Sequence, residues 1–130
     1  MINRLPYLRR QSISTIDTGR RGEDLAAELL LKHRYVILQR NYRWARGEID
    51  IIAKKEGVLV FVEVKTARGN AFGDPETWVT ERKQQQIGLV AERYLQEKEI
   101  QDMDCRFDVI AVKADGRQWQ IKHIENAFWL

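Results

Sequence analysis

The sequence has 130 residues, 44% hydrophobic and 32% charged, which suits one globular domain and excludes a disordered chain. No segment is apolar and long enough for a signal peptide or a membrane span, so we expect a cytoplasmic protein without a membrane partner. One cysteine, Cys105, excludes an internal disulfide and a cysteine-ligated zinc cluster, and a net charge of +3 identifies no partner by itself.

The predicted elements follow one another in the order α-β-β-β-α-β-β. Residues 1–16 are predicted to form a flexible basic arm, and residues 17–130 a single domain without an internal boundary. Asp17 or Thr18 can cap the first helix, which apolar residues at helical spacing carry to about residue 32. This order predicts an α/β domain with a mixed sheet and helices packed on it. The later elements are strands at 35–42, 48–54 and 58–66, a helix capped by Thr80, and strands at 107–112 and from residue 118.

The strands at 48–54 and 58–66 carry acidic residues inside apolar runs. If Glu56-Gly57 is a two-residue hairpin turn, Asp50 lies directly across from Glu63. Opposed Cβ atoms on one face of a sheet lie roughly 4.5–5.5 Å apart. Two carboxylates held that close repel each other unless a proton or a cation lies between them. The hairpin therefore predicts a site for a divalent cation.

The donor atoms in this hairpin suit Mg²⁺ or Mn²⁺, because these ions prefer oxygen ligands and need few protein groups. Asp50 and Glu63 supply carboxylates, and the backbone carbonyl of Val64 can supply a third oxygen. Lys65 can orient a water molecule or stabilise charge on a reacting phosphate. The alternative is a surface hairpin in which Glu48 and Lys65 form an ordinary cross-strand ion pair and Asp50 is solvated.

Both predicted helices bring further polar residues toward the same end of the sheet. Glu23 falls at the edge of the apolar stripe of the first helix and can act as an additional acid, directly or through water. Lys83 and Gln84 lie at the start of the second helix. Alternatively, Glu23 only stabilises the first turn of its helix, where a negative charge is favourable, and the aliphatic parts of Lys83 and Gln84 lie along the edge of the core.

The charge distribution and the loop at 67–78 suggest a polyanionic ligand. Residues 1–46 contain 10 Lys/Arg and 4 Asp/Glu, whereas residues 47–130 contain 12 and 15. A basic flank beside an acidic site suits a nucleic acid, although a solvated basic surface explains the same charges. In the loop, Arg68 and Trp78 can contact a nucleic acid, although a disordered surface loop explains the same composition. Arg106 and Asp108 alternate on one strand face and are predicted to pair internally, and His123 lacks a partner motif.

Four blocks in this order resemble the YraN-type uncharacterised bacterial family of the PD-(D/E)xK nuclease superfamily, which is similar to archaeal Holliday-junction resolvases. They are GRRGEDLA at 19–26, RGEIDII at 46–52, VFVEVK at 60–65 and RFDV at 106–109. The chain has Ile49 where the superfamily name places Pro before the Asp. The resemblance implies a restriction-endonuclease-like αβββαβ core with a mixed central sheet flanked by helices.

The resemblance also implies Mg²⁺- or Mn²⁺-dependent hydrolysis of DNA phosphodiester bonds, including branched, Holliday-junction-like DNA. By position it makes Asp50 and Glu63 metal ligands, Lys65 the catalytic lysine and Glu23 an accessory acid. It favours DNA over RNA, and a homodimer would suit a two-stranded substrate. The alternatives are a non-catalytic nucleic-acid-binding module and a protein-interaction domain that retain the fold. The residues expected to contact the nucleic acid are Arg20, Arg21, Arg46, Arg68, Lys83 and Gln84.

Overall fold

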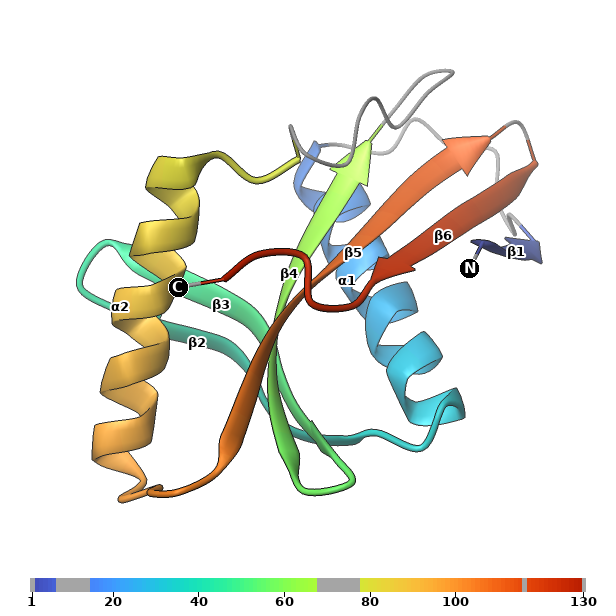
Figure 1. Ribbon diagram of the computed structural model, residues 1–130. Helices are drawn as coiled ribbons and strands as arrows, with labels where there is room; N and C mark the ends of the chain where they lie inside the picture. The colour runs from blue at the N-terminus through green and yellow to red at the C-terminus, as the bar shows by residue number, and fades with distance from the viewer. Residues whose placement is uncertain (1, 7–14, 68–77, 116, 130) are drawn as a thin grey trace.

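The computed structural model describes residues 2–6, 15–67, 78–115 and 117–129. It contains one six-stranded sheet with the strand order β1-β6-β5-β4-β3-β2 and two helices (Figure 1). The predicted α/β class and the order α-β-β-β-α-β-β from the first helix onward are confirmed. The elements are β1 (Ile2–Pro6), α1 (Thr15–Lys32), β2 (Val36–Trp44), β3 (Gly47–Lys55), β4 (Val58–Ala67), α2 (Glu81–Glu97), β5 (Asp104–Asp115) and β6 (Gln118–Ile124).

The two helices cover opposite faces of the twisted sheet (Figure 1). Leu25 and Leu30 of α1 pack with Val60 and Val62 of β4, whereas α2 packs against the face that carries Phe61. Strands β4 and β5 are parallel and all other neighbours are antiparallel. Because β4 is buried on both faces, its sequence is a nearly continuous apolar run. No helix in the described part of the chain is long and apolar enough to cross a membrane.

The β3–β4 hairpin has the predicted register. Glu56 and Gly57 have φ values of 50° and 79°, which a two-residue type I′ turn requires. Paired residues run from Lys55↔Val58 to Ile51↔Val62, so their numbers add up to the predicted 113 throughout. The neighbouring strand β2 contains a bulge, because its pairing with β3 shifts by one residue between Ile37 and Gln39.

The N-terminal part of the chain differs from the prediction. Residues 2–6, assigned to a flexible arm, form β1 and pair antiparallel with β6 from Ile2↔Lys122 to Pro6↔Gln118. Helix α1 begins at Thr15, before the caps expected at Asp17 or Thr18. Five residues that end in proline give too short a pattern to identify a strand, and the pairing of β1 depends on a partner more than 100 residues away.

Two glycines allow the helices to approach the sheet closely. A Cβ atom at Gly22 of α1 would overlap the Thr66 hydroxyl oxygen on β4, and one at Gly47 of β3 would overlap a methyl group of Val90 on α2. Each glycine directly precedes an acidic residue, Glu23 or Glu48. The close contacts therefore fix the positions at which these two acids leave the backbone.

Gly22→Ala is expected to lower the free energy of unfolding by about 1–2 kcal/mol, because overpacking against Thr66 outweighs the helix preference of alanine. Gly19→Ala, one helical turn earlier, is the matched control, since nothing lies within 4 Å of its Cβ position. It should raise that free energy by about 0.5–1 kcal/mol. Urea unfolding measures both, and Thr66→Ala should rescue the Gly22→Ala variant. Equal stability of the two alanine variants would contradict the close contact.

Candidate active site

The sheet opens between β3 and β4 at the predicted site. Strand β4 stays paired with β5 up to Ala67↔Lys113, but its pairing with β3 ends at Ile51↔Val62. Beyond that point the Asp50 carboxylate takes the place of a strand partner, because its Oδ2 atom accepts a hydrogen bond of 2.7 Å from the Val64 N–H. The N–H and C=O groups of one strand residue face the same neighbouring strand. The Val64 carbonyl is therefore expected to face Asp50 as well.

Asp50 and Glu63 form a partly buried, mutually repelling pair. The Glu63 side chain is only 15% exposed, and burial followed by the charge of Asp50 raises the pKa of Glu63 to about 8. Burial likewise raises the pKa of Asp50 to about 6, against the effect of the Val64 N–H, and the charges of Glu23 and Glu48 add to the rise. Close to neutral pH, the pair therefore binds a proton unless a cation takes its place.

Two lysines lie at the edge of this pair without neutralising it. The Lys83 ammonium is 3.9 Å from Glu63 Oε1, and Lys65 is exposed. The charges of both lysines lower the pKa of Glu63, but burial and Asp50 outweigh them. Thr80 fixes the helix start beside Lys83, because its hydroxyl accepts a 3.2 Å hydrogen bond from the Lys83 N–H. Gln84, expected to contact a nucleic acid, donates its side-chain amide to the Val79 carbonyl at 3.0 Å.

Glu23 and Glu48 are joined by a residue that the sequence analysis missed. The Asn41 side-chain amide donates to Glu23 Oε2 at 2.9 Å and to Glu48 Oε1 at 3.0 Å. Asn41 has a φ of 54°, a left-handed conformation that asparagine tolerates better than most residues. The sequence does contain one sign of this role, because asparagine is uncommon inside β-strands and Asn41 lies within a predicted strand.

Arginines of β2 hold the outer sides of the same two acids. Arg40 donates to Glu23 Oε1 at 3.0 Å and to Asp24 Oδ1 at 2.7 Å, and Arg43 donates to Glu48 Oε2 at 3.2 Å. The expected opposition of Glu48 and Lys65 is absent, because the described pairing of β3 with β4 ends before it reaches Glu48. These side chains line a depression of about 430 Å³, which Gly19 and Arg20 complete.

The donor set near Asp50 suits a hydrated hard cation but does not form a closed cage. Within residues 15–67, 78–115 and 117–129, no three His, Cys, Asp or Glu side chains converge to hold a metal ion by themselves. Asp50, Glu63 and the Val64 carbonyl offer three oxygens, and Mg²⁺ commonly binds one or two carboxylates while it retains water ligands. A divalent cation would also relieve the repulsion that raises both carboxyl pKa values.

The predicted nucleic-acid contacts are scattered around this opening. Arg20 and Arg46 are exposed, Arg21 is half-buried, and Arg68 lies outside the described residues. The expectation that Trp78 contacts a nucleic acid is wrong for this structure, because Trp78 is only 7% exposed and belongs to the core under α2. The composition of the loop does not reveal that Trp78 is packed into this core.

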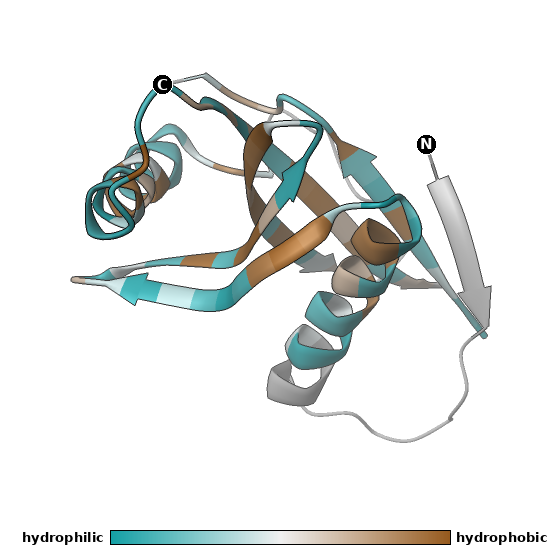
Figure 2. Cartoon of the chain, turned by 90° about the horizontal axis from the view of Figure 1, so that it is seen from below, coloured by the Kyte–Doolittle hydropathy of each residue, from teal (hydrophilic) through white to brown (hydrophobic). Residues whose placement is uncertain are grey.

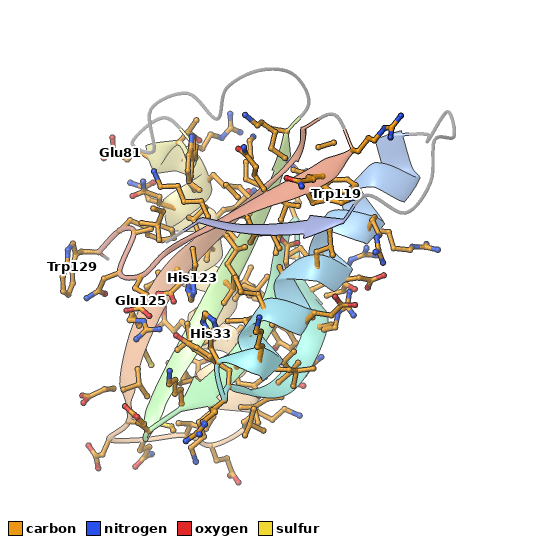
Figure 3. All side chains as sticks on the ribbon, turned by 90° about the vertical axis from the view of Figure 1, so that its right-hand side faces the viewer. His33, Glu81, Trp119, His123, Glu125 and Trp129 are labelled. Carbon is orange, nitrogen blue, oxygen red and sulfur yellow. The ribbon has the colours of Figure 1, made fainter. Side chains whose placement is uncertain are left out.

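A second buried carboxylate has a different environment. Asp108 is fully buried and accepts hydrogen bonds from Arg106 at 2.8 and 2.9 Å and from the Asn126 N–H at 3.0 Å. The predicted Arg106–Asp108 pair is thus confirmed, and His123, for which no partner was expected, lies 2.8 Å from Asp108. Figure 3 shows His123 on β6 and Glu125 in the following turn. Burial acts to raise the pKa of Asp108, but His123 and Arg106 outweigh it and lower the pKa.

Asp108→Asn is expected to lower the free energy of unfolding by about 3 kcal/mol, because Arg106 would lose its buried anion. Asp104→Asn, at the exposed start of the same strand, should change it by less than about 0.5 kcal/mol. Urea unfolding at pH 7 compares the two variants. A loss that is equally small in both would contradict a structural role for Asp108.

In EDTA, the free energy of unfolding is expected to fall as the pH rises from about 5 to about 9. The pKa values rise from 3.8 to about 6 for Asp50 and from 4.5 to about 8 for Glu63. The folded chain therefore binds more protons than the unfolded chain in this range, and this stability is lost as the pH passes the folded values. Urea unfolding across this pH range measures the effect.

Asp50→Asn should flatten this profile and raise stability at pH 8 by on the order of 1 kcal/mol, because it removes one of the two repelling charges. Glu28→Gln, exposed on α1, is the control and should keep the wild-type profile. A flat wild-type profile, or an Asp50→Asn variant less stable than wild type at pH 8, would contradict the repulsion.

Comparison with known proteins places the chain in a bacterial family. The model of uncharacterised protein family UPF0102 matches residues 22–112. A UPF0102 protein of Geobacter metallireducens is 44% identical over 119 residues, which cover 92% of this chain and 98% of that protein. A UPF0102 protein of Geobacter sulfurreducens is 48% identical over 86% of this chain and 88% of its own length, and one of Flavobacterium johnsoniae is 40% identical over 87% and 94%. The chain thus belongs to the uncharacterised protein family UPF0102, the YraN-type family that its sequence blocks resemble.

Proposed function

We propose that this protein is a Mg²⁺- or Mn²⁺-dependent nuclease that hydrolyses DNA phosphodiester bonds. The observation that carries the proposal is the partly buried Asp50–Glu63 pair, in which the Val64 N–H binds Asp50 where the pairing of β3 with β4 ends. A buried pair of like charges is costly, and a structural role would be served better by apolar residues. Strained electrostatics of this kind cluster at functional sites.

The chemistry follows from the positions of the side chains around the opening. Asp50, Glu63 and the Val64 carbonyl would hold the divalent ion. When bound, that ion supplies a water molecule of lowered pKa and neutralises charge on the scissile phosphate. Lys65 is exposed and within electrostatic range of Glu63, so its ammonium can orient the attacking water or stabilise the charge that develops on the phosphate.

The residues around the pair suit a polyanionic substrate. Exposed Arg20 borders the depression that Glu23 and Glu48 line and can bind a substrate phosphate, and exposed Arg46 in the β2–β3 turn can bind a more distant one. Lys83 balances part of the charge of Glu63 at the start of α2. Asn41 keeps the Glu23 and Glu48 carboxylates turned toward β2, and their charges keep the opening anionic before a cation binds. The proposal includes DNA in preference to RNA, branched DNA as a substrate, and a homodimer that presents two such sites.

Purified protein incubated with linear, single-stranded and four-way-junction DNA in Mn²⁺ is expected to cleave at least one substrate, and EDTA should abolish cleavage. Asp50→Ala and Glu63→Gln should reduce the rate at least about 10²-fold, and Lys65→Ala about 10²–10⁴-fold. Glu28→Gln, on the solvent side of α1, should cleave at the wild-type rate. In parallel, Mn²⁺ should raise the melting temperature of wild type but not of Asp50→Ala.

Each possible result separates the proposal from its alternatives. Cleavage that persists equally in Asp50→Ala and Glu63→Gln would identify a contaminating enzyme and contradict the proposal. DNA binding without cleavage, weakened by salt, would favour the non-catalytic nucleic-acid-binding module. Absence of binding, cleavage and Mn²⁺ stabilisation would favour the protein-interaction domain.

A further inference from the structure

The tip of the β2–β3 hairpin carries an exposed aromatic side chain. Trp44 pairs with Gly47 across a two-residue turn in which Ala45 has a φ of 54°. Figures 1 and 2 show this hairpin projecting past α2 from the body of the sheet. Trp44 is 42% exposed, although a tryptophan in a hairpin that packs only for stability is usually well covered.

The environment of this ring is cationic. The Arg93 guanidinium of α2 lies 5.9 Å from the centroid of the Trp44 ring, which supports the ring from the side of the helix. Arg46, in the turn two residues after Trp44, is exposed as well, whereas Arg43 leaves the opposite face of the strand and binds Glu48. An exposed aromatic ring among arginines is the combination with which proteins bind unpaired nucleotides, because bases stack on the ring while cations bind the phosphates.

The hairpin also sets the distance from this ring to the candidate active site. Trp44 follows Asn41, which binds Glu23 and Glu48, by three residues along the same strand. At roughly 3.3 Å per residue, the ring lies about 10 Å along β2 from that position. A fully stacked nucleic-acid strand rises by about 3.4 Å per nucleotide and an unstacked strand spans more, so this distance corresponds to at most about three nucleotides.

We propose that Trp44 stacks on the base of an unpaired nucleotide, within about three nucleotides of the phosphate at the Asp50–Glu63 pair, while Arg46 binds an adjacent phosphate. The proposal rests on the proposed function for its substrate class. It deepens that function by assigning a preference for DNA with a single-stranded segment. Base stacking requires an open ring face, which a fully paired duplex does not offer except at its ends.

Fluorescence anisotropy with a labelled single-stranded 20-mer and the matching duplex tests this in EDTA, where no cleavage occurs. Wild type should bind the single strand more tightly, and Trp44→Ala should weaken that binding by about 5- to 150-fold with little effect on the duplex. Trp44→Phe should retain most of the affinity, whereas Trp44→Leu should resemble Trp44→Ala. The matched control is Trp129→Ala, because Trp129 is 79% exposed and projects from the C-terminal tail (Figure 3).

Salt dependence and intrinsic fluorescence distinguish stacking from a merely apolar contact. Arg46→Gln should reduce the slope of log Kd against log salt by about 1, whereas Trp44→Ala should leave that slope unchanged. The single strand should quench the fluorescence of wild type, and Trp44→Phe should lose most of that quenching. Melting temperatures confirm that each variant is folded.

Equal affinities of wild type, Trp44→Ala and Trp129→Ala for the single strand would overturn the proposal, as would a Trp44→Leu variant that binds like Trp44→Phe. Absence of nucleic-acid binding by wild type would also overturn it. Failure of the proposed function gives a different result from failure of the stacking proposal. If wild type binds through Trp44 but cleaves nothing in Mn²⁺, stacking stands and catalysis does not.

Discussion

The hydrogen bond from the Val64 N–H to Asp50 determines the arrangement of the whole site. Strand β4 needs a partner on the side of β3 after Val62, and a carboxylate supplies it instead of a backbone carbonyl. The sheet can therefore open without leaving a buried N–H unsatisfied, which would cost about 1–3 kcal/mol. The same bond brings Asp50 beside Glu63, so the opening and its negative charge are produced together.

The two carboxyl centres of this fold illustrate how environment determines role. Asp108 has hydrogen-bond donors from three residues, and its pKa is lowered despite full burial. Asp50 has the Val64 N–H as its donor and three acidic residues nearby, and its pKa is raised. The first arrangement is electrostatically complete and connects β5, β6 and the tail. The second has an excess of negative charge, and such an excess suits a centre that binds a cation or a reacting group.

Local patterns predicted much of the fold, because the turn at Glu56-Gly57 sets the register of β3 and β4 and Thr80 marks the start of α2. The same register predicts that Asp50 lies near Glu63. It did not predict that the strands separate beyond Val62, because a turn sets the register of a hairpin but not the length over which its strands stay paired. It therefore paired Glu48 with Lys65 rather than with Asn41 and Arg43. Strand β1 and the partners of His123 escaped prediction for a similar reason, since their contacts join distant parts of the chain.

At the bulge between Ile37 and Gln39, the number of residues matters more to the fold than their identity. It shifts the rest of β2 by one residue relative to β3, and this shift turns Tyr42 into the core under α2. Side chains alternate between the two faces of a strand, so deletion of the extra residue would reverse the facing of every later position. Leu38, at the shift, is 44% exposed, so its side chain can vary. Substitutions of Leu38 should therefore be tolerated, whereas deletion of one residue from this segment would displace Asn41 from the two acids that it joins.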